Sequence, residues 1–283
     1  MAMTVVTNVP SMTAQRNLNK TNNSLNKSLQ RLSSGLRINT AADDAAGLGI
    51  SEKLQSQIRS MAQAERNAGD AVSLLQTAES SLSEMSGIVT RMRELTIQAA
   101  NDTVGSTERQ FLDDELTQLR DEFDRIASVT EFNGTKLIDG SVSGTNQLTF
   151  QVGTGATSND RIEVSIATTT AGSVGTTAAT SGLNAVGLTT LTAAQGSLAI
   201  LDEAISDIST QRATLGASQN RMEVTISNLS SARENLSAAN SRIRDVDVAS
   251  ESANLTRANI LTQAGVSVLA QANQTPTLAL SLI

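Results

Sequence analysis

The residues of this sequence with the most evident chemical potential are the adjacent carboxylates Asp43 and Asp44. Paired carboxylates can bind a divalent cation or take part in acid–base catalysis. No third ligand lies near them in the sequence, and carboxylates at the start of a helix interact favourably with the helix dipole. We therefore interpret the pair as the solvated start of a helix, and we predict no metal site.

The composition argues against other catalytic chemistry. The 283 residues include no Cys, His, Trp or Tyr, which removes thiol nucleophiles, disulfides, the usual general base and any helical HExxH zinc site. Gly153 and Gly155 form only the first half of a nucleotide-binding glycine pattern, and no helix is predicted to follow them. The sequence therefore predicts a protein that is not an enzyme and has no cofactor.

The charge is unevenly distributed along the chain. The net charge is −7, yet the first 42 residues contain five Lys or Arg and no acidic residue. The acidic remainder argues against nucleic acid as a partner. A basic, Ser-rich and amphipathic start also fits an organellar transit peptide, an alternative that this segment leaves open, and no cleavable secretory signal is visible.

A heptad repeat identifies the longest predicted helix, over about 193–243. One position recurs every seven residues and is always apolar, and in a chain that is 39% hydrophobic the odds of this by chance are roughly one in a thousand. The repeat comprises Leu201, Ile208, Leu215, Met222, Leu229, Leu236 and Ile243. The second heptad position is mostly polar and includes Arg212 and Gln219. We expect these two residues to set the register between helices and not to add stability.

Two further helices are predicted to cover this rod. Apolar residues recur at steps of four and three from Leu54 to Ala99, with one three-residue slip, which predicts a helix over about 44–100. A shorter stripe predicts a helix over about 106–128, which Ser106 could cap. Glycines at 35, 47 and 49 mark a joint between rods, where Asn39 or Thr40 could cap the next helix.

The period changes near residue 130. Asn133-Gly134 is a turn signal, and the segments 148–153 and 161–166 alternate as short strands do, so we predict a small β-region over about 130–168. Residues from about 169 to 192 are rich in Thr, Ala, Gly and Ser. We interpret them as an exposed variable linker that would tolerate insertions.

The two chain ends are predicted to pack against other copies of the chain. The final 26 residues carry no charge but are too polar for a membrane span, and the first helix has a leucine stripe. A contact between ends that runs head to tail and does not close produces a filament. The residues that we expect to drive polymerisation are Leu18, Leu25, Leu29, Leu32, Leu36, Ile260, Val266, Leu269, Leu278 and Leu280.

Four segments of the chain closely resemble bacterial flagellins. They are SLQRLSSGLRINTAADDAAGLGISEKL at 28–54, RMRELTIQAAND at 91–102, EFNGTKLIDG at 131–140 and the ending ILTQAGVSVLAQANQTPTLALSLI. The resemblance implies a mainly α fold, a long antiparallel helical bundle with a small β-hairpin region and a terminal two-helix coiled coil. It implies a channel-lining terminal domain of residues 1–43 plus 244–283 and a rod domain of residues 44–243.

The resemblance also implies a function and partners. The chain would be the subunit of the flagellar filament, a homopolymer for motility, exported unfolded and assembled at the tip. Its partners would include an export chaperone, the export apparatus, and cap and junction proteins, and its location would be extracellular or periplasmic. A hook–filament junction protein and an intracellular coiled-coil scaffold remain as alternatives.

The residue spacing and the resemblance together predict one more functional surface, a recognition site on the helix predicted over about 44–100. Arg91, Leu95 and Gln98 follow i, i+4, i+7 spacing, and we expect them to point away from the neighbouring apolar seam. Together with Glu115 they resemble the site at which a host Toll-like receptor detects flagellin monomers. The resemblance implies that this face also contacts neighbouring subunits in the filament.

Overall fold

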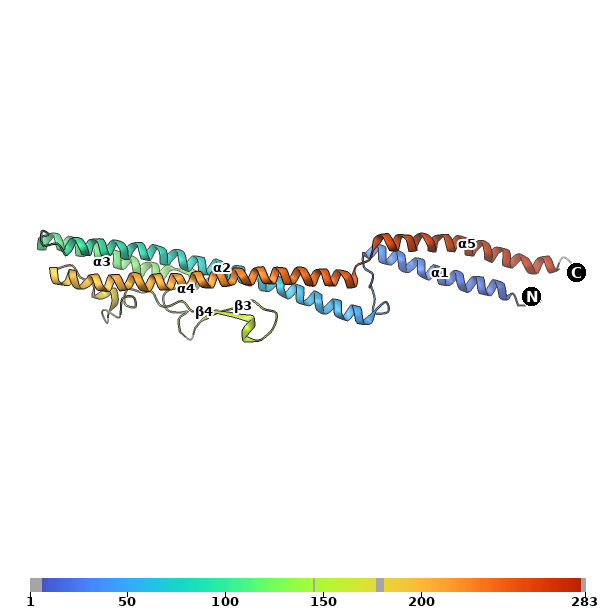
Figure 1. Ribbon diagram of the computed structural model, residues 1–283, viewed down its shortest axis with the longest axis horizontal. Coiled ribbons are helices and arrows are strands. Elements are labelled where there is room, and N and C mark those ends of the chain that lie inside the picture. The colour runs from blue at the N-terminus through green and yellow to red at the C-terminus, as the bar shows by residue number, and fades with distance from the viewer. Residues whose placement is uncertain (1–6, 145, 177–180, 281–283) are drawn as a thin grey trace. The chain divides into compact units, whose positions relative to one another are not determined.

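The computed structural model describes residues 7–144, 146–176 and 181–280, with side chains as far as Gln274 (Figure 1). Its five α-helices are α1 (Val9–Ser34), α2 (Ala45–Ala99), α3 (Ser106–Val129), α4 (Leu191–Arg244) and α5 (Val248–Leu280). The chain forms two compact units. One contains the residues up to Ile58 and from Glu234 onward, here called the terminal unit, and the other, Arg59–Arg233, is called the rod unit. The helical pattern predicted from the sequence is confirmed.

The rod unit is built on a continuous apolar core contributed by α2, α3, α4 and the β-region. Every predicted core position of α2 from Ala78 to Ala99 is fully buried, including Thr96, whose hydroxyl donates to the Met92 carbonyl at 2.7 Å. The α4 repeat is buried from Leu201 to Met222. From Leu229 onward the same heptad position is only half-buried.

Ion pairs between α2 and α4 fix their antiparallel register within the rod unit. Arg93 binds Asp202 at 2.6 Å, and Arg233 binds Glu65 at 3.0 Å. Between them, the Arg212 guanidinium binds Glu79 at 2.8 Å. Gln219, the other polar residue predicted in a core position, has a buried Nε2 without a hydrogen-bond partner among the described residues. Arg212 therefore has a partner on α2, whereas Gln219 has none there.

The β-region consists of two short antiparallel hairpins. Strands β1 (Glu131–Phe132) and β2 (Thr135–Lys136) are joined by Asn133 and Gly134, which both have positive φ, as a tight hairpin turn requires. Strands β3 (Leu148–Gln151) and β4 (Arg161–Val164) pair in the predicted segments. The turn and the two strands are thus confirmed.

The segment predicted as an exposed linker is largely docked onto the rod unit, so that prediction was wrong. Ala171, Leu183 and Leu188 are fully buried in the core. Carboxylates of the helices accept its backbone N–H groups: Asp124 binds Ala171 at 2.7 Å and Asp113 binds Leu188 at 2.7 Å. The prediction rested on the composition of the segment alone, which does not show that carboxylates of α3 bind its backbone. Residues 177–180 lie outside the described part of the chain.

The predicted helix caps also differ from the structure. Helix α2 begins at Ala45, and Asp44 caps it by accepting the Gly47 N–H at 2.8 Å, so Asn39 and Thr40 are not caps. Ser106 is the first residue of α3, after the cap position Gly105. Asp44 nevertheless has the role of a helix-start carboxylate that the sequence predicted.

Candidate assembly and recognition surfaces

Helices α1 and α5 lie side by side and run antiparallel in the terminal unit (Figure 1). At one end the Asn8 side chain donates to the Ala272 carbonyl at 2.8 Å, and the Ser11 hydroxyl donates to Asn273 at 2.7 Å. At the other end Ser28 on α1 meets Glu251 on α5. These contacts hold the two chain ends together as one helical pair.

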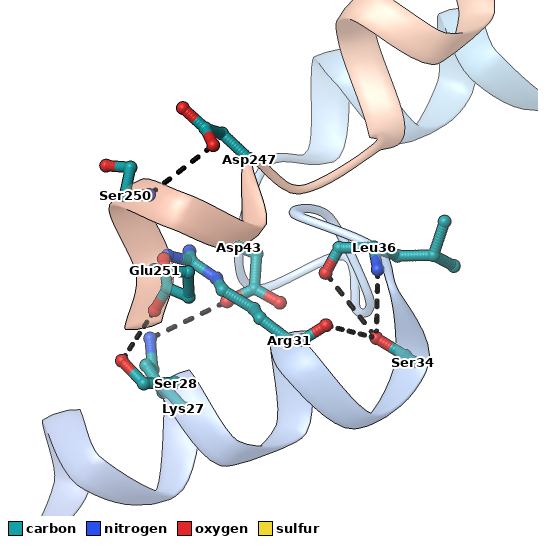
Figure 2. Close-up of polar contacts among 9 residues, drawn as sticks. All are labelled: Lys27, Ser28, Arg31, Ser34, Leu36, Asp43, Asp247, Ser250 and Glu251. Atoms are coloured by element: carbon teal, nitrogen blue, oxygen red, sulfur yellow. Dashed lines mark hydrogen bonds and ion pairs between the residues drawn. The ribbon is translucent and has the colours of Figure 1, made fainter. Parts of the chain in front are cut away.

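A buried carboxylate fixes the register of this pair. Glu251 is 7% exposed and accepts a hydrogen bond from the Ser28 hydroxyl at 2.5 Å, while Arg31 lies 3.7 Å from its other oxygen (Figure 2). A buried charge is tolerated only when it is paired and hydrogen-bonded, as it is here. The burial of Glu251 was not predicted, because its partner Ser28 lies at the other end of the chain and only the fold brings the two together.

The joint beyond α1 is held by backbone hydrogen bonds. Gly35 ends α1 in the left-handed conformation, with φ of 72°. The Val246 N–H donates to the Gly35 carbonyl at 3.1 Å, and the Arg37 N–H donates to the Arg244 carbonyl at 2.6 Å. The Asp43 carboxylate lies 3.6 Å from Lys27 (Figure 2). Hydrogen bonds from Thr40 lower the pKa of this carboxyl. Asp43 is thus a structural residue of the joint.

The apolar side chains of the terminal unit are poorly covered. Only Ile38 and Ala258 are buried apolar residues among those described there. On α5 the exposed fractions of Ile260, Leu261 and Val266 are 60%, 52% and 54%. Of the residues predicted to drive polymerisation, Leu29 is exposed, whereas Leu18, Leu25, Leu32, Leu36 and Leu269 are half-buried. The side chains of Leu278 and Leu280 lie outside the described part.

The predicted recognition stripe is brought together only in part. Arg91 on α2 donates to Glu115 on α3 at 2.9 Å and to Glu94 at 3.0 Å. These bonds raise the pKa of the guanidinium, Glu115 having the larger effect. Gln98 is exposed. Arg91 and Glu115 thus form an exposed ion pair that bridges two helices.

Leu95 is not exposed, so its predicted orientation was wrong. Its side chain is 1% exposed and belongs to the rod core. The residue follows Met92 by three positions and precedes Ala99 by four, which places it on the edge of the same helix face. Because α2 packs in a core with both α3 and α4, its buried face is wider than the seam inferred from the heptad positions.

The chain is similar to known proteins over both of its helical regions. Residues 5–143 match the bacterial flagellin N-terminal helical region, and residues 198–283 match the bacterial flagellin C-terminal helical region. The chain is 46% identical over 276 residues to a flagellin of Halalkalibacterium halodurans, covering 98% of each chain. This chain belongs to the bacterial flagellin family. A member of this family is a structural subunit of the flagellar filament.

Two other similarities agree with this assignment. The flagellar filament 33 kDa core protein of Treponema phagedenis is 43% identical over 283 residues, with 98% of each chain covered. The structure of a putative flagellar hook-associated protein from Vibrio parahaemolyticus superposes with a TM-score of 0.58 at 14% identity, covering 72% of this chain and 100% of that one. The latter similarity concerns the fold alone, whereas the flagellin relatives match over nearly their whole length.

The described part of this flagellin-family chain contains no group of three or more acidic side chains placed to hold a metal ion. No described helix is both long and apolar enough to cross a membrane.

Proposed function

We propose that the α1–α5 pair is the surface through which this filament subunit polymerises, with each copy burying its terminal unit against others. The observation that carries the proposal is the row of exposed apolar side chains on the uncharged stretch of α5, including Ile260, Leu261, Val266 and Val268. Fully burying one such side chain stabilises a protein by about 1.5–3 kcal/mol. A head-to-tail contact that does not close into a ring generates a filament.

Truncation tests this proposal. Deleting residues 258–283 should abolish polymerisation and leave the rod unit folded, because the rod core draws no residue from this segment. Sedimentation measures the polymer, and circular dichroism measures the retained helix. Normal filaments from the truncated chain would refute the proposal.

Point variants test the contribution of the exposed apolar side chains to assembly without removing part of α5, as the truncation does. Ile260→Ser and Val266→Ser together should raise the critical concentration for assembly at least about tenfold, since two anchors are removed. Val224→Ser is the matched control, because Val224 is 61% exposed on α4 in the rod unit. Equal effects of the two changes would show that exposed apolar residues have no special role in the terminal unit.

The proposal includes export and location. The chain would pass unfolded through the flagellar export apparatus with the help of an export chaperone, and assemble at the tip together with cap and junction proteins. Support comes from the absence of Cys, and hence of disulfides that would block threading. The filament would lie outside the cell or in the periplasm; immunogold labelling of whole and sectioned source cells distinguishes the two locations.

We also propose that the exposed face around Arg91, Gln98 and Glu115 is the one by which a host Toll-like receptor recognises the monomer. The support is the bridging ion pair, whose side chains are 51% and 44% exposed. Leu95, being buried, would act through the fold and not by contact. Titrating monomer against the receptor ectodomain tests the proposal: Arg91→Ala should lower the affinity about tenfold, and unchanged affinity would contradict it.

A further inference from the structure

A cationic hollow lies between α1 and α5 in the terminal unit. It has a volume of about 430 Å³, and its lining includes Lys20, Lys27, Arg31, Arg257 and a single acidic residue, Glu251. That acid is already neutralised, since it is bound to Ser28 and Arg31 (Figure 2). Lys27 pairs with Asp43 at 3.6 Å, which leaves Lys20 and Arg257 as the lining cations without an ion pair among the described residues.

The heptad geometry explains why the hollow exists. The helices are antiparallel, so the position seven residues before Ser28 on α1 faces the position seven residues after Glu251 on α5. Those positions hold Thr21 and Ala258, both of which line the hollow. Ala258 thus occupies the heptad position that Glu251 occupies seven residues earlier. Its methyl group is smaller than a Glu side chain and carries no charge, so it neither fills the space nor neutralises the nearby cations.

Two of the cations around Ala258 have no acidic partner in the described part of the chain. Among the described residues, Lys20 and Arg257 form no ion pair with any acidic side chain, and Lys27 pairs only with Asp43 at 3.6 Å. The neighbouring Ser24 and Thr21 hydroxyls donate to α1 backbone carbonyls. The hollow therefore offers cations, as Arg31 does beside Glu251, but Ala258 stands where a carboxylate would be.

We propose that this hollow receives an acidic side chain of a second copy of the chain, and that this side chain is Asp245. The inference rests on the proposed polymerisation of the terminal unit and names one of its contacts. Asp245 is exposed and lies at the joint, paired through its backbone with Leu36, while its carboxylate binds no described residue. The hollow and the joint are different patches of the same unit, so their contact is head to tail, the kind that produces a filament when it does not close into a ring.

A charge exchange tests the pairing. Two variants place like charges at the contact: Lys20→Glu/Arg257→Glu in the hollow (the groove variant) and Asp245→Lys at the joint (the joint variant). Each should raise the critical concentration for assembly at least about tenfold, because like charges then meet. An equimolar mixture of the two should assemble again as an alternating polymer. The triple variant should also assemble, since each contact again joins opposite charges.

Matched controls keep the test decisive. Lys53→Glu/Arg59→Glu makes the same charge change at exposed α2 residues outside the hollow and should leave the critical concentration within about twofold of wild type. Circular dichroism of every variant before mixing reports whether α1 and α5 are retained. Folded groove and joint variants that fail alone and assemble together would establish the contact.

Three outcomes would overturn the inference. The first is wild-type assembly by the groove variant, and the second is failure of both the mixture and the triple variant despite folded chains. The third is wild-type assembly that requires added inorganic phosphate and reaches a plateau as its concentration rises, while assembly of the groove variant does not depend on phosphate. That result would identify a free anion as the occupant of the hollow. Failure of the wild-type chain itself to polymerise would instead refute the proposed function.

Discussion

At the scale of single residues, Leu95 and Arg91 lie one helical turn apart on α2 in opposite environments. Leu95 is 1% exposed within the rod core, whereas the Arg91 side chain is 51% exposed. Leu95→Ala should therefore destabilise the monomer by about 2–5 kcal/mol through loss of burial and formation of a cavity. Arg91→Ala should leave the denaturant midpoint nearly unchanged, because exposed ion pairs contribute little.

Equilibrium unfolding in urea measures both variants. A Leu95→Ala chain as stable as wild type would show that the helix can rotate this residue into solvent. A large loss of stability in Arg91→Ala would show that the ion pair to Glu115 helps hold α3 against α2, and would weaken its use as a probe of receptor binding.

The side chain of Gln219 is expected to lower the stability of the monomer. Its Nε2 is buried without a partner among the described residues, and such a group costs about 1–3 kcal/mol. Gln219→Leu should raise the free energy of unfolding by about 1 kcal/mol, since an apolar side chain of similar size removes that cost. Arg212→Leu should not, because it would leave Glu79 without its partner.

Thermal unfolding of the monomer compares Gln219→Leu with Gln118→Leu, an exposed position on α3 where the change should have little effect. A destabilised Gln219→Leu chain would indicate a structural role for the amide. Electron microscopy of the filaments tests the second half of the idea, that Gln219 sets register, by an altered curvature.

At the scale of elements, the β3–β4 hairpin depends on one carboxylate. Asp160 accepts the Thr157 hydroxyl at 2.6 Å and the N–H groups of Gly155 and Thr157 at 3.1 Å. The Thr157 hydroxyl and then the Gly155 N–H are the largest contributions that lower the pKa of Asp160 below 3.8. The carboxylate form is therefore the one that holds the loop between the strands.

The pH dependence of this loop follows from the sign of the shift. A lowered native pKa contributes stability above the unfolded value of 3.8, and this contribution is lost as the pH falls through the native pKa. The protection of the loop amides, measured as their exchange rate relative to the intrinsic rate at the same pH, should decrease in the wild-type chain as the pH falls through the native pKa, below 3.8. In Asp160→Asn the protection should already be low at neutral pH, and protection that stays high at every pH in either chain would contradict this account.

The elements themselves were predictable because each repeats a simple physical pattern. The α2 and α4 heptads, the Asn133-Gly134 turn and the two strands all follow from periodicity and from glycine's tolerance of positive φ. The docking of residues 169–176 and 181–192 was not predictable, because it depends on carboxylates of α3 such as Asp113 and Asp124 binding distant backbone N–H groups. The burial of Glu251 was missed for the same reason, since its partner Ser28 lies at the other end of the chain.

At the scale of the whole molecule, the two units differ in how completely they are packed. The rod unit contains nearly all of the buried apolar residues described, whereas the terminal unit contributes only Ile38 and Ala258. Helical pairs without a substantial core open at low free energy. On heating the monomer, we therefore expect the terminal unit to lose helix first, in a broad transition, before the cooperative unfolding of the rod unit.

Calorimetry with helix-specific circular dichroism detects this order, and the chain lacking residues 258–283 serves as the reference. The truncated chain should show the second transition alone, at an unchanged temperature. A single sharp transition in the full-length monomer would show that the terminal unit is already as stable as the rod.

The central claim is that other copies complete the packing of the terminal unit, and hydrogen exchange in monomer and filament tests it most directly. Amides of α1 and of α5 up to residue 274 should exchange rapidly in the monomer and at least about a hundredfold more slowly in the filament, while those of the α2–α4 core are slow in both. Protection of α1 and α5 that is already complete in the monomer, or that does not change on polymerisation, would contradict the account.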